Sequence, residues 1–158
     1  MICYNKTKNY IIVDKPFGIS SQADKSGDKD LMSLTADMLA ANGEPNSLWL
    51  IHRLDRVVGG LIVFARNEKY AALLSEAAAG NNLVKEYLAV VNGACDSGEM
   101  IDYLYKDARL SKSFVVKSKR NGTKEARLEY QCVKTIRLGD KNVSLVKIRL
   151  HTGRFHQI

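Results

Sequence analysis

The segment His52-Arg53-Leu54-Asp55-Arg56-Val57-Val58-Gly59-Gly60-Leu61-Ile62-Val63-Phe64-Ala65 decides the fold of this chain. Its first five residues are mostly charged, whereas Leu61–Ala65 is an apolar run that is typical of a buried strand. The run Leu48–Ile51 before it is also apolar, so the charged pentapeptide is expected on a loop between two strands. Gly59 and Gly60 supply the backbone freedom for a turn or a close approach.

Apolar runs and capping residues predict the elements on either side of this segment. Tyr10–Val13 is a β-branched run that ends at a turn containing proline and glycine, so we expect a strand. Asp30 has the residue type of a helix N-cap and precedes apolar residues at helical spacing, which continue to about Ala41. Asn67 caps a second pattern of this kind, which ends near Gly80. Both patterns predict helices.

From residue 83 onward the sequence is typical of strands joined by short turns. The predicted strands cover residues 83–91, 100–105, 113–116, 125–136 and 143–150. Two early helices followed by a run of strands predict an α+β fold, built on a mixed, mainly antiparallel sheet with flanking helices. Because the sequence contains no repeat and no linker, we expect one domain.

Composition limits the kinds of partner and the cellular location that we expect for this chain. The chain of 158 residues carries a net charge of +7, which favours an anionic partner, and its 46% hydrophobic content argues against a disordered protein. Cys3, Cys95 and Cys132 have neither metal-ligand nor disulfide spacing, so we expect reduced thiols, no metal and a cytoplasmic location. No signal peptide or run of membrane-spanning length is present, so no membrane partner is expected.

Asp55 stands between Arg53 and Arg56, and this arrangement permits two interpretations. The arginines can hold phosphate groups while they keep the aspartate ionised at neutral pH, which suits a nucleophile. Equally, the three residues can form a surface ion-pair cluster at the end of a strand, which contributes little to stability. The spacing alone does not choose between these interpretations.

Four segments together resemble the RluA-type pseudouridine synthases. Residues 52–66 resemble the central His-Arg-Leu-Asp-Arg motif of that family, although residues 57–59 read Val-Val-Gly where many members have a polar residue followed by Thr and Ser. Residues 11–18, IIVDKPFG, resemble the opening strand and its Lys-Pro-x-Gly turn. Residues 85–91, KEYLAVV, resemble a Lys-x-Tyr-x-Ala strand, and residues 150–158, LHTGRFHQI, resemble the Thr-Gly-Arg-x-His-Gln-Ile-Arg motif. The resemblance covers essentially the whole chain.

The resemblance implies roles for individual residues. Asp55 matches the essential catalytic aspartate of the family. Tyr87 matches a tyrosine that packs against the target base and is a candidate acceptor of the C5 proton, although a tyrosine on a strand is usually a core residue. Arg53 matches an arginine that fills the space left by the flipped uridine, a role that suits a planar guanidinium, although a structural salt bridge also explains it.

The resemblance further implies that His52, Arg56, Arg154 and His156 bind RNA, although the last two also fit a solvated basic face. In the family an arginine follows the Gln-Ile pair and pairs with the catalytic aspartate, whereas this sequence ends at Ile158. We therefore expect residues 1–158 to be a C-terminally truncated catalytic domain without a separate N-terminal RNA-binding domain. Loss of that partner is expected to weaken the activity of the chain as given.

The resemblance implies an enzyme that isomerises uridine to pseudouridine in structured ribosomal or transfer RNA, acting on a flipped-out nucleotide. A monomer that needs no metal and no cofactor is expected. Whether the aspartate acts as a nucleophile at C1′ or as a base at C2′ stays open. Two alternatives also stay open, namely a non-catalytic RNA-binding module and a glycoside or nucleoside hydrolase, although hydrolases usually position two carboxylates.

Overall fold

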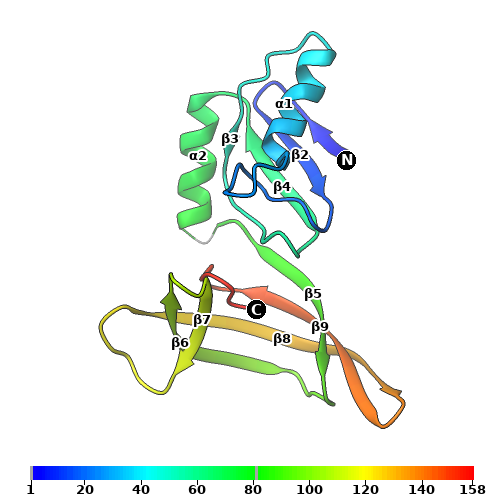
Figure 1. The fold of residues 1–158 in the computed structure, drawn as a ribbon, viewed down its shortest axis with the longest axis vertical. Helices are drawn as coiled ribbons and strands as arrows, with labels where there is room; N and C mark the ends of the chain where they lie inside the picture. The colour runs from blue at the N-terminus through cyan, green and yellow to red at the C-terminus, as the bar shows by residue number, and fades with distance from the viewer. Residues whose placement is uncertain (1, 81) are drawn as a thin grey trace. The chain divides into compact units, whose positions relative to one another are not determined.

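The computed structural model describes residues 2–80 and 82–158 and divides the chain into two compact units (Figure 1). Unit 1 is Met1–Asn82 and unit 2 is Leu83–Ile158. Each unit has its own sheet and its own buried residues. That both units form one catalytic domain stays a prediction.

Unit 1 is a four-stranded sheet with two helices. In chain order its elements are β1 (Cys3–Lys6), β2 (Tyr10–Lys15), α1 (Leu31–Ala41), β3 (Trp49–Leu50), β4 (Gly60–Ala65) and α2 (Glu68–Ala79). The strand order is β1-β2-β4-β3, and every pair is antiparallel. The central strands β2 and β4 are the apolar runs that the sequence predicts, and they pair from Tyr10 opposite Ala65 to Lys15 opposite Gly60.

Apolar side chains of the two central strands and of α1 form the core of unit 1. The fully buried ones are Ile11, Val13, Leu31, Leu39, Ile62, Phe64 and Ala65. Both helices begin at the predicted caps, because Asp30 Oδ1 accepts from the Ser33 N–H at 3.1 Å and Asn67 Oδ1 accepts from the Tyr70 N–H at 3.0 Å. This core fixes the ends of β2 and β4, between which the charged loop lies.

Unit 2 is a five-stranded antiparallel sheet. Its strands are β5 (Lys85–Asn92), β6 (Gly98–Asp107), β7 (Lys112–Val116), β8 (Thr123–Leu138) and β9 (Lys141–Leu150), in the order β5-β9-β8-β6-β7. Each end lies within two residues of the prediction. Leu128, Val146 and Ile148 form the buried cluster of this sheet.

The α+β class is confirmed, and two details differ from the prediction. Every strand pair between described residues is antiparallel, and the strands form two sheets where one was expected. Strand β1 was not predicted, because Cys3–Lys6 is polar and exposed and, among the described strands, pairs with β2 alone.

Two further features concern membrane and metal binding. Within residues 2–80 and 82–158, no helix is both long enough and apolar enough to cross a membrane. In the same ranges, no three His, Cys, Asp or Glu side chains come together as a metal site requires.

Candidate active site

The loop between β3 and β4 carries the charged pentapeptide, and Leu54 anchors it. Leu54 is buried, whereas Arg53 and Asp55 on either side of it are exposed. The Ser21 hydroxyl donates to the Leu54 carbonyl at 2.8 Å and accepts from the Leu54 N–H at 3.1 Å. Because both backbone groups of Leu54 are fixed, its two neighbours are held at the surface.

A tight turn follows Asp55 and depends on the two glycines. The Asp55 carbonyl accepts from the Val58 N–H at 2.9 Å. A Cβ atom on Gly59 would lie 3.4 Å from the Lys15 carbonyl oxygen, and Gly60 has a φ of 135°, which favours glycine. The loop therefore both turns and approaches the end of β2, as the glycine pair predicts.

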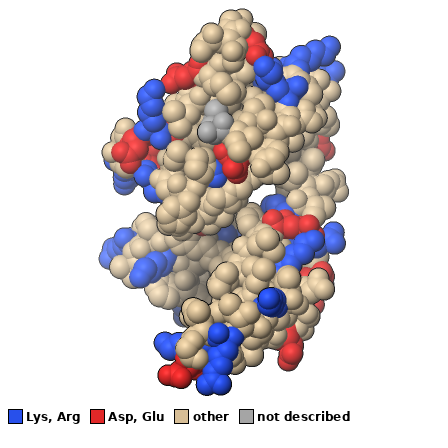
Figure 2. Space-filling model, turned by 90° about the vertical axis from the view of Figure 1, so that its right-hand side faces the viewer, with Lys and Arg blue, Asp and Glu red and all other residues tan. Residues whose placement is uncertain are grey.

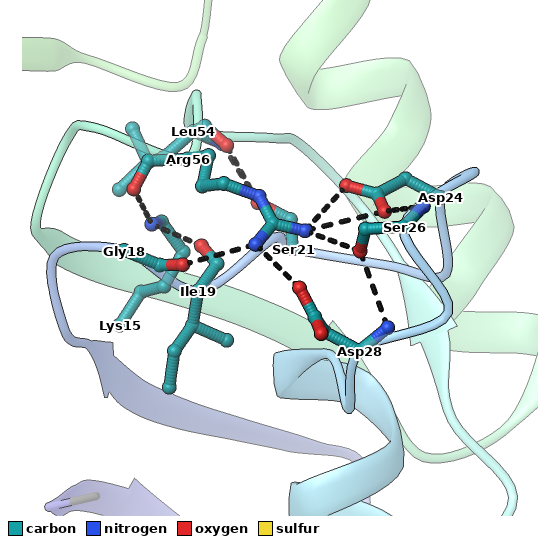
Figure 3. Close-up of polar contacts among 9 residues, drawn as sticks. All are labelled: Lys15, Gly18, Ile19, Ser21, Asp24, Ser26, Asp28, Leu54 and Arg56. Atoms are coloured by element: carbon teal, nitrogen blue, oxygen red, sulfur yellow. Dashed lines mark hydrogen bonds and ion pairs between the residues drawn. The ribbon is translucent and has the colours of Figure 1, made fainter.

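Lys15 fastens this loop to the turn after β2 (Figure 3). Its side chain is fully buried, and its ammonium donates to the carbonyls of Ile19 at 2.6 Å, Pro16 at 3.2 Å and Arg56 at 3.3 Å. Burial lowers the pKa of Lys15, the charge of Asp55 raises it and that of Arg56 lowers it. The lysine is therefore close enough to Asp55 for their charges to interact. The sequence interpretation treated Lys15 only as part of a turn, and the Lys-Pro-x-Gly pattern was the available signal.

The guanidinium of Arg56 binds an acidic loop (Figure 3). It donates to Asp28 Oδ2 at 2.9 Å, to Asp24 Oδ2 at 3.0 Å and to the Ser26 hydroxyl at 2.7 Å. The pKa of Asp24 is lowered by Ser26 and by Arg56, the pKa of Asp28 is lowered by Arg56 first, and the pKa of Arg56 is raised by both carboxylates. Arg56 therefore ties the loop 24–28 to the Asp55 loop, and its predicted RNA contact stays a prediction.

His52 and Arg53 complete the predicted residues of this loop. His52 Nε2 accepts from the Val63 N–H of β4 at 3.3 Å, which requires that this nitrogen is unprotonated. Arg53 is exposed. The structure thus brings His52, Arg53, Asp55 and Arg56 together on one anchored loop of unit 1.

The other predicted residues lie in unit 2. Tyr87 is half-buried on β5 opposite Ile148 and packs against the cluster that contains Leu128 and Val146. Arg154 Nε donates to the Glu125 carbonyl at 2.7 Å. The expected position of Tyr87 beside Asp55 stays a prediction.

Hydrogen bonds within the chain shape the segment 152–157 after β9. Gln157 Oε1 accepts from the Thr152 hydroxyl and from the Arg154 N–H, both at 2.9 Å, and its amide nitrogen donates to the Arg127 carbonyl at 3.2 Å. His156 has a φ of 51° and stacks on the Phe155 ring, with the ring centroids 3.8 Å apart. Thr152 and Gln157 therefore set the path along which Arg154 and His156 are presented.

Positive and negative side chains are mixed on one face of the molecule. On the face shown in Figure 2, Lys and Arg form several small groups with Asp and Glu among them. The net charge of +7 is therefore a weak guide to a binding site, and individual pockets and loops are more informative.

The fold and the loop define the class of protein, namely an α+β protein that presents an aspartate beside two arginines on an anchored loop. Residues 9–158 match the model of the RNA pseudouridylate synthase family. The chain therefore belongs to that family, which confirms the predicted resemblance.

Curated relatives agree with this assignment. The chain is 31% identical over 160 residues to tRNA pseudouridine synthase C of Haemophilus influenzae, and the match covers 94% of this chain and 64% of that protein. It is 29% identical over 152 residues to ribosomal large subunit pseudouridine synthase C of Rickettsia bellii, covering 95% of this chain and 48% of that protein. The chain thus spans about half to two thirds of the length of these relatives.

Solved structures support the fold. Human RNA Pseudouridylate Synthase Domain Containing 4 is similar with a TM-score of 0.79 and 21% identity, over 98% of this chain and 60% of that one. Human RNA Pseudouridylate Synthase Domain Containing 1 has a TM-score of 0.81 and 17% identity, over 98% of this chain and 61% of that one. At these identities the likeness concerns the fold alone, and it confirms the predicted fold class.

Proposed function

We propose that this chain carries the catalytic residues of an RNA pseudouridine synthase, an enzyme that isomerises uridine to pseudouridine in structured ribosomal or transfer RNA. Asp55 is the proposed catalytic carboxylate. The observation that carries the proposal is an exposed aspartate whose loop is fixed by Leu54, Ser21 and Lys15, in a chain of this family. Names of relatives include both a tRNA and a ribosomal enzyme, so both RNA classes are proposed.

The proposed reaction breaks the bond from C1′ to N1, rotates the uracil and forms a bond from C1′ to C5. N1 gains a proton and C5 loses one, so the product is an isomer of the substrate. Asp55 acts either as a nucleophile at C1′ or as a base at C2′, and Tyr87 is the proposed acceptor of the C5 proton. The target nucleotide must leave its base stack to reach the carboxylate. Arg53 is proposed to fill the space that the nucleotide leaves in the stack.

The surroundings of Asp55 support its proposed role. Lys15 donates to the carbonyl of Arg56, the residue after Asp55, and the charge of Asp55 raises the pKa of Lys15. Because Lys15 is buried and holds three carbonyl groups, its charge is fixed in place before RNA arrives. A preorganised carboxylate is what either mechanism requires.

The proposal is tested with the Asp55→Asn variant of the full-length protein and single-turnover conversion of unmodified tRNA and rRNA transcripts. Asparagine removes the charge with little change in shape, so product formation should be abolished while RNA affinity and thermal stability stay near wild type. Asp14→Asn on β2 is the matched control and should retain activity. An active Asp55→Asn protein contradicts the assignment of the carboxylate.

The same assay separates the alternatives. A wild-type protein that binds RNA without forming pseudouridine would be a binding module. Release of free uracil would identify a hydrolase. Comparison of pseudouridine positions in RNA from cells with and without the gene then identifies the target uridine.

A further inference from the structure

A pocket in unit 2, away from the Asp55 loop in the sequence, carries three cationic side chains. It has a volume of about 230 Å³ and is lined by Lys106 of β6, Lys124 of β8 and Arg154 of the segment after β9, together with Ser113 and Phe155. The sequence motifs predict RNA binding for Arg154 alone among these residues. Nothing in those motifs points to the two lysines.

Strand register explains why the lysines share this pocket. Lys106 pairs with Ser113 of β7, and Leu104, two residues before Lys106 on β6, pairs with Lys124 of β8. Residues directly opposite each other project from the same face of a sheet, as do residues two apart on one strand. Both lysines therefore lie on one face of the sheet, on neighbouring strands.

The third cation is brought to this face by the segment after β9. Arg154 Nε donates to the Glu125 carbonyl at 2.7 Å, and the Ser113 hydroxyl donates to the Phe155 carbonyl. The Lys106 ammonium lies over the Phe155 ring, 4.4 Å from its centroid. The two hydrogen bonds hold the segment that carries Arg154 against the sheet, so a ligand does not have to order it.

The pocket has an excess of positive charge. Among the ion pairs of the described residues, none involves Lys106, Lys124 or Arg154. Like charges gathered on one face repel each other, and an anion in the pocket relieves this repulsion. The arginine also keeps further N–H donors beyond the one that binds Glu125, because a guanidinium has five.

We propose that this pocket is a phosphate-binding subsite that receives a phosphodiester of the RNA substrate, with Lys106, Lys124 and Arg154 as its cations. This inference rests on the proposed function. A phosphate fits better than a base, because the Phe155 ring already contacts the Lys106 ammonium and the His156 ring. Phosphate contacts position an RNA without reading its sequence, so the subsite contributes affinity and register to many RNAs alike.

The test uses the double variant Lys106→Gln/Lys124→Gln in the full-length protein. Both lysines are exposed, so these substitutions should leave the thermal unfolding temperature near wild type. The matched control is Lys134→Gln/Lys141→Gln, which removes the same charge from exposed lysines at the β8–β9 hairpin. Binding of a labelled stem–loop RNA with uridines in its loop is measured by fluorescence anisotropy over a series of salt concentrations.

The double variant should bind the stem–loop more weakly, and the slope of log K against log salt should become shallower by roughly 0.7–0.9 for each phosphate that the protein no longer binds. In single-turnover conversion of tRNA and rRNA transcripts, the RNA concentration at half-maximal rate should rise while the rate at saturation stays near wild type. The control variant should keep a nearly wild-type slope.

Two outcomes overturn the subsite and leave the proposed function intact. One is a Lys106→Gln/Lys124→Gln protein with a wild-type salt slope and a wild-type half-saturating RNA concentration. The other is a control variant whose slope falls by as much, because the effect would then belong to net charge. A wild-type protein that neither binds RNA nor forms pseudouridine defeats both proposals together.

Discussion

The buried ammonium of Lys15 donates a hydrogen bond to the backbone carbonyl of Arg56, 3.3 Å away. This bond joins the end of β2 to the residue that follows Asp55, so β2 and the proposed catalytic loop are held together. The charge of Asp55 raises the pKa of Lys15 against the larger effect of burial, so the two side chains are also coupled electrostatically.

Lys15→Met tests this connection, because methionine keeps most of the apolar stem and removes the ammonium. The carbonyls of Pro16 and Ile19 would lose this donor, whereas the Arg56 carbonyl would keep the Gly18 N–H at 2.8 Å. A buried acceptor left unsatisfied costs about 1–3 kcal/mol. We therefore expect urea denaturation to show a free energy of unfolding lowered by about that amount, together with slower conversion of RNA.

Lys8→Met provides the control, because Lys8 is exposed in the turn between β1 and β2. Its effect on the free energy of unfolding should stay within about 0.5 kcal/mol. Equal stability losses for the two variants would show that the three carbonyl contacts of Lys15 do not stabilise the loop.

Tyr87→Phe separates packing from hydroxyl chemistry. The ring packs against Leu128, Val146 and Ile148, and phenylalanine preserves that packing, so thermal stability should stay near wild type. If the hydroxyl accepts the C5 proton, the single-turnover rate at saturating RNA should fall by about 10²-fold or more. Tyr130→Phe is the matched control, because Tyr130 packs against the same cluster and also pairs with Ile148. A Tyr87→Phe rate equal to wild type would make Tyr87 a stacking platform.

Much of the fold could be predicted because the core strands carry local signals. The apolar run of β4 and the caps Asp30 and Asn67 are visible in the sequence, and the structure contains all of them. Strand β1 could not be predicted, because its exposed polar residues show no alternation and only pairing with β2 makes them a strand.

The site was only partly predictable for a similar reason. The motif identified Asp55 and its neighbours, but the partners of Arg56 lie on another loop, at Asp24 and Asp28, where no spacing relates them to it. The burial of Lys15 likewise depends on the path of the β3–β4 loop, which folds over the end of β2. Such contacts are tertiary and leave no periodic pattern in the sequence.

Cys132 and Cys95 should differ in reactivity. The Thr135 hydroxyl lies 3.5 Å from Cys132 Sγ and is the largest cause of a lowered pKa for that thiol. The Ser144 hydroxyl lowers the pKa of Cys95, but burial, the Cys132 thiol and the charge of Asp96 all raise it, and the pKa of Cys95 is raised overall. Iodoacetamide labelling followed by mass spectrometry should therefore detect Cys132 modification at a lower pH than Cys95 modification.

Thr135→Val checks the cause of this difference, because it removes the hydroxyl that stabilises the Cys132 thiolate. The labelling of Cys132 should then shift to higher pH, whereas Thr123→Val, at the start of the same strand, should leave it unchanged. Labelling of Cys132 and Cys95 with the same dependence on pH in the wild-type protein would contradict the prediction.

Arg56 should make the loop 24–28 sensitive to acid. The folded-state pKa of Asp24 is lowered by Ser26 and Arg56, and that of Asp28 mainly by Arg56, below the ordinary aspartate value of about 3.9. A carboxylate with a lowered pKa stabilises the folded state fully above its unfolded value, and this stabilisation disappears as the pH falls through the folded value. Amide protection factors around Ser26, which correct for the intrinsic pH dependence of hydrogen exchange, should therefore be high at neutral pH and should fall at pH values below about 3.9.

Arg56→Gln should give low protection already at neutral pH, whereas Arg53→Gln on the same loop should be protected like wild type. High protection in Arg56→Gln would mean that the acidic loop keeps its position without the guanidinium.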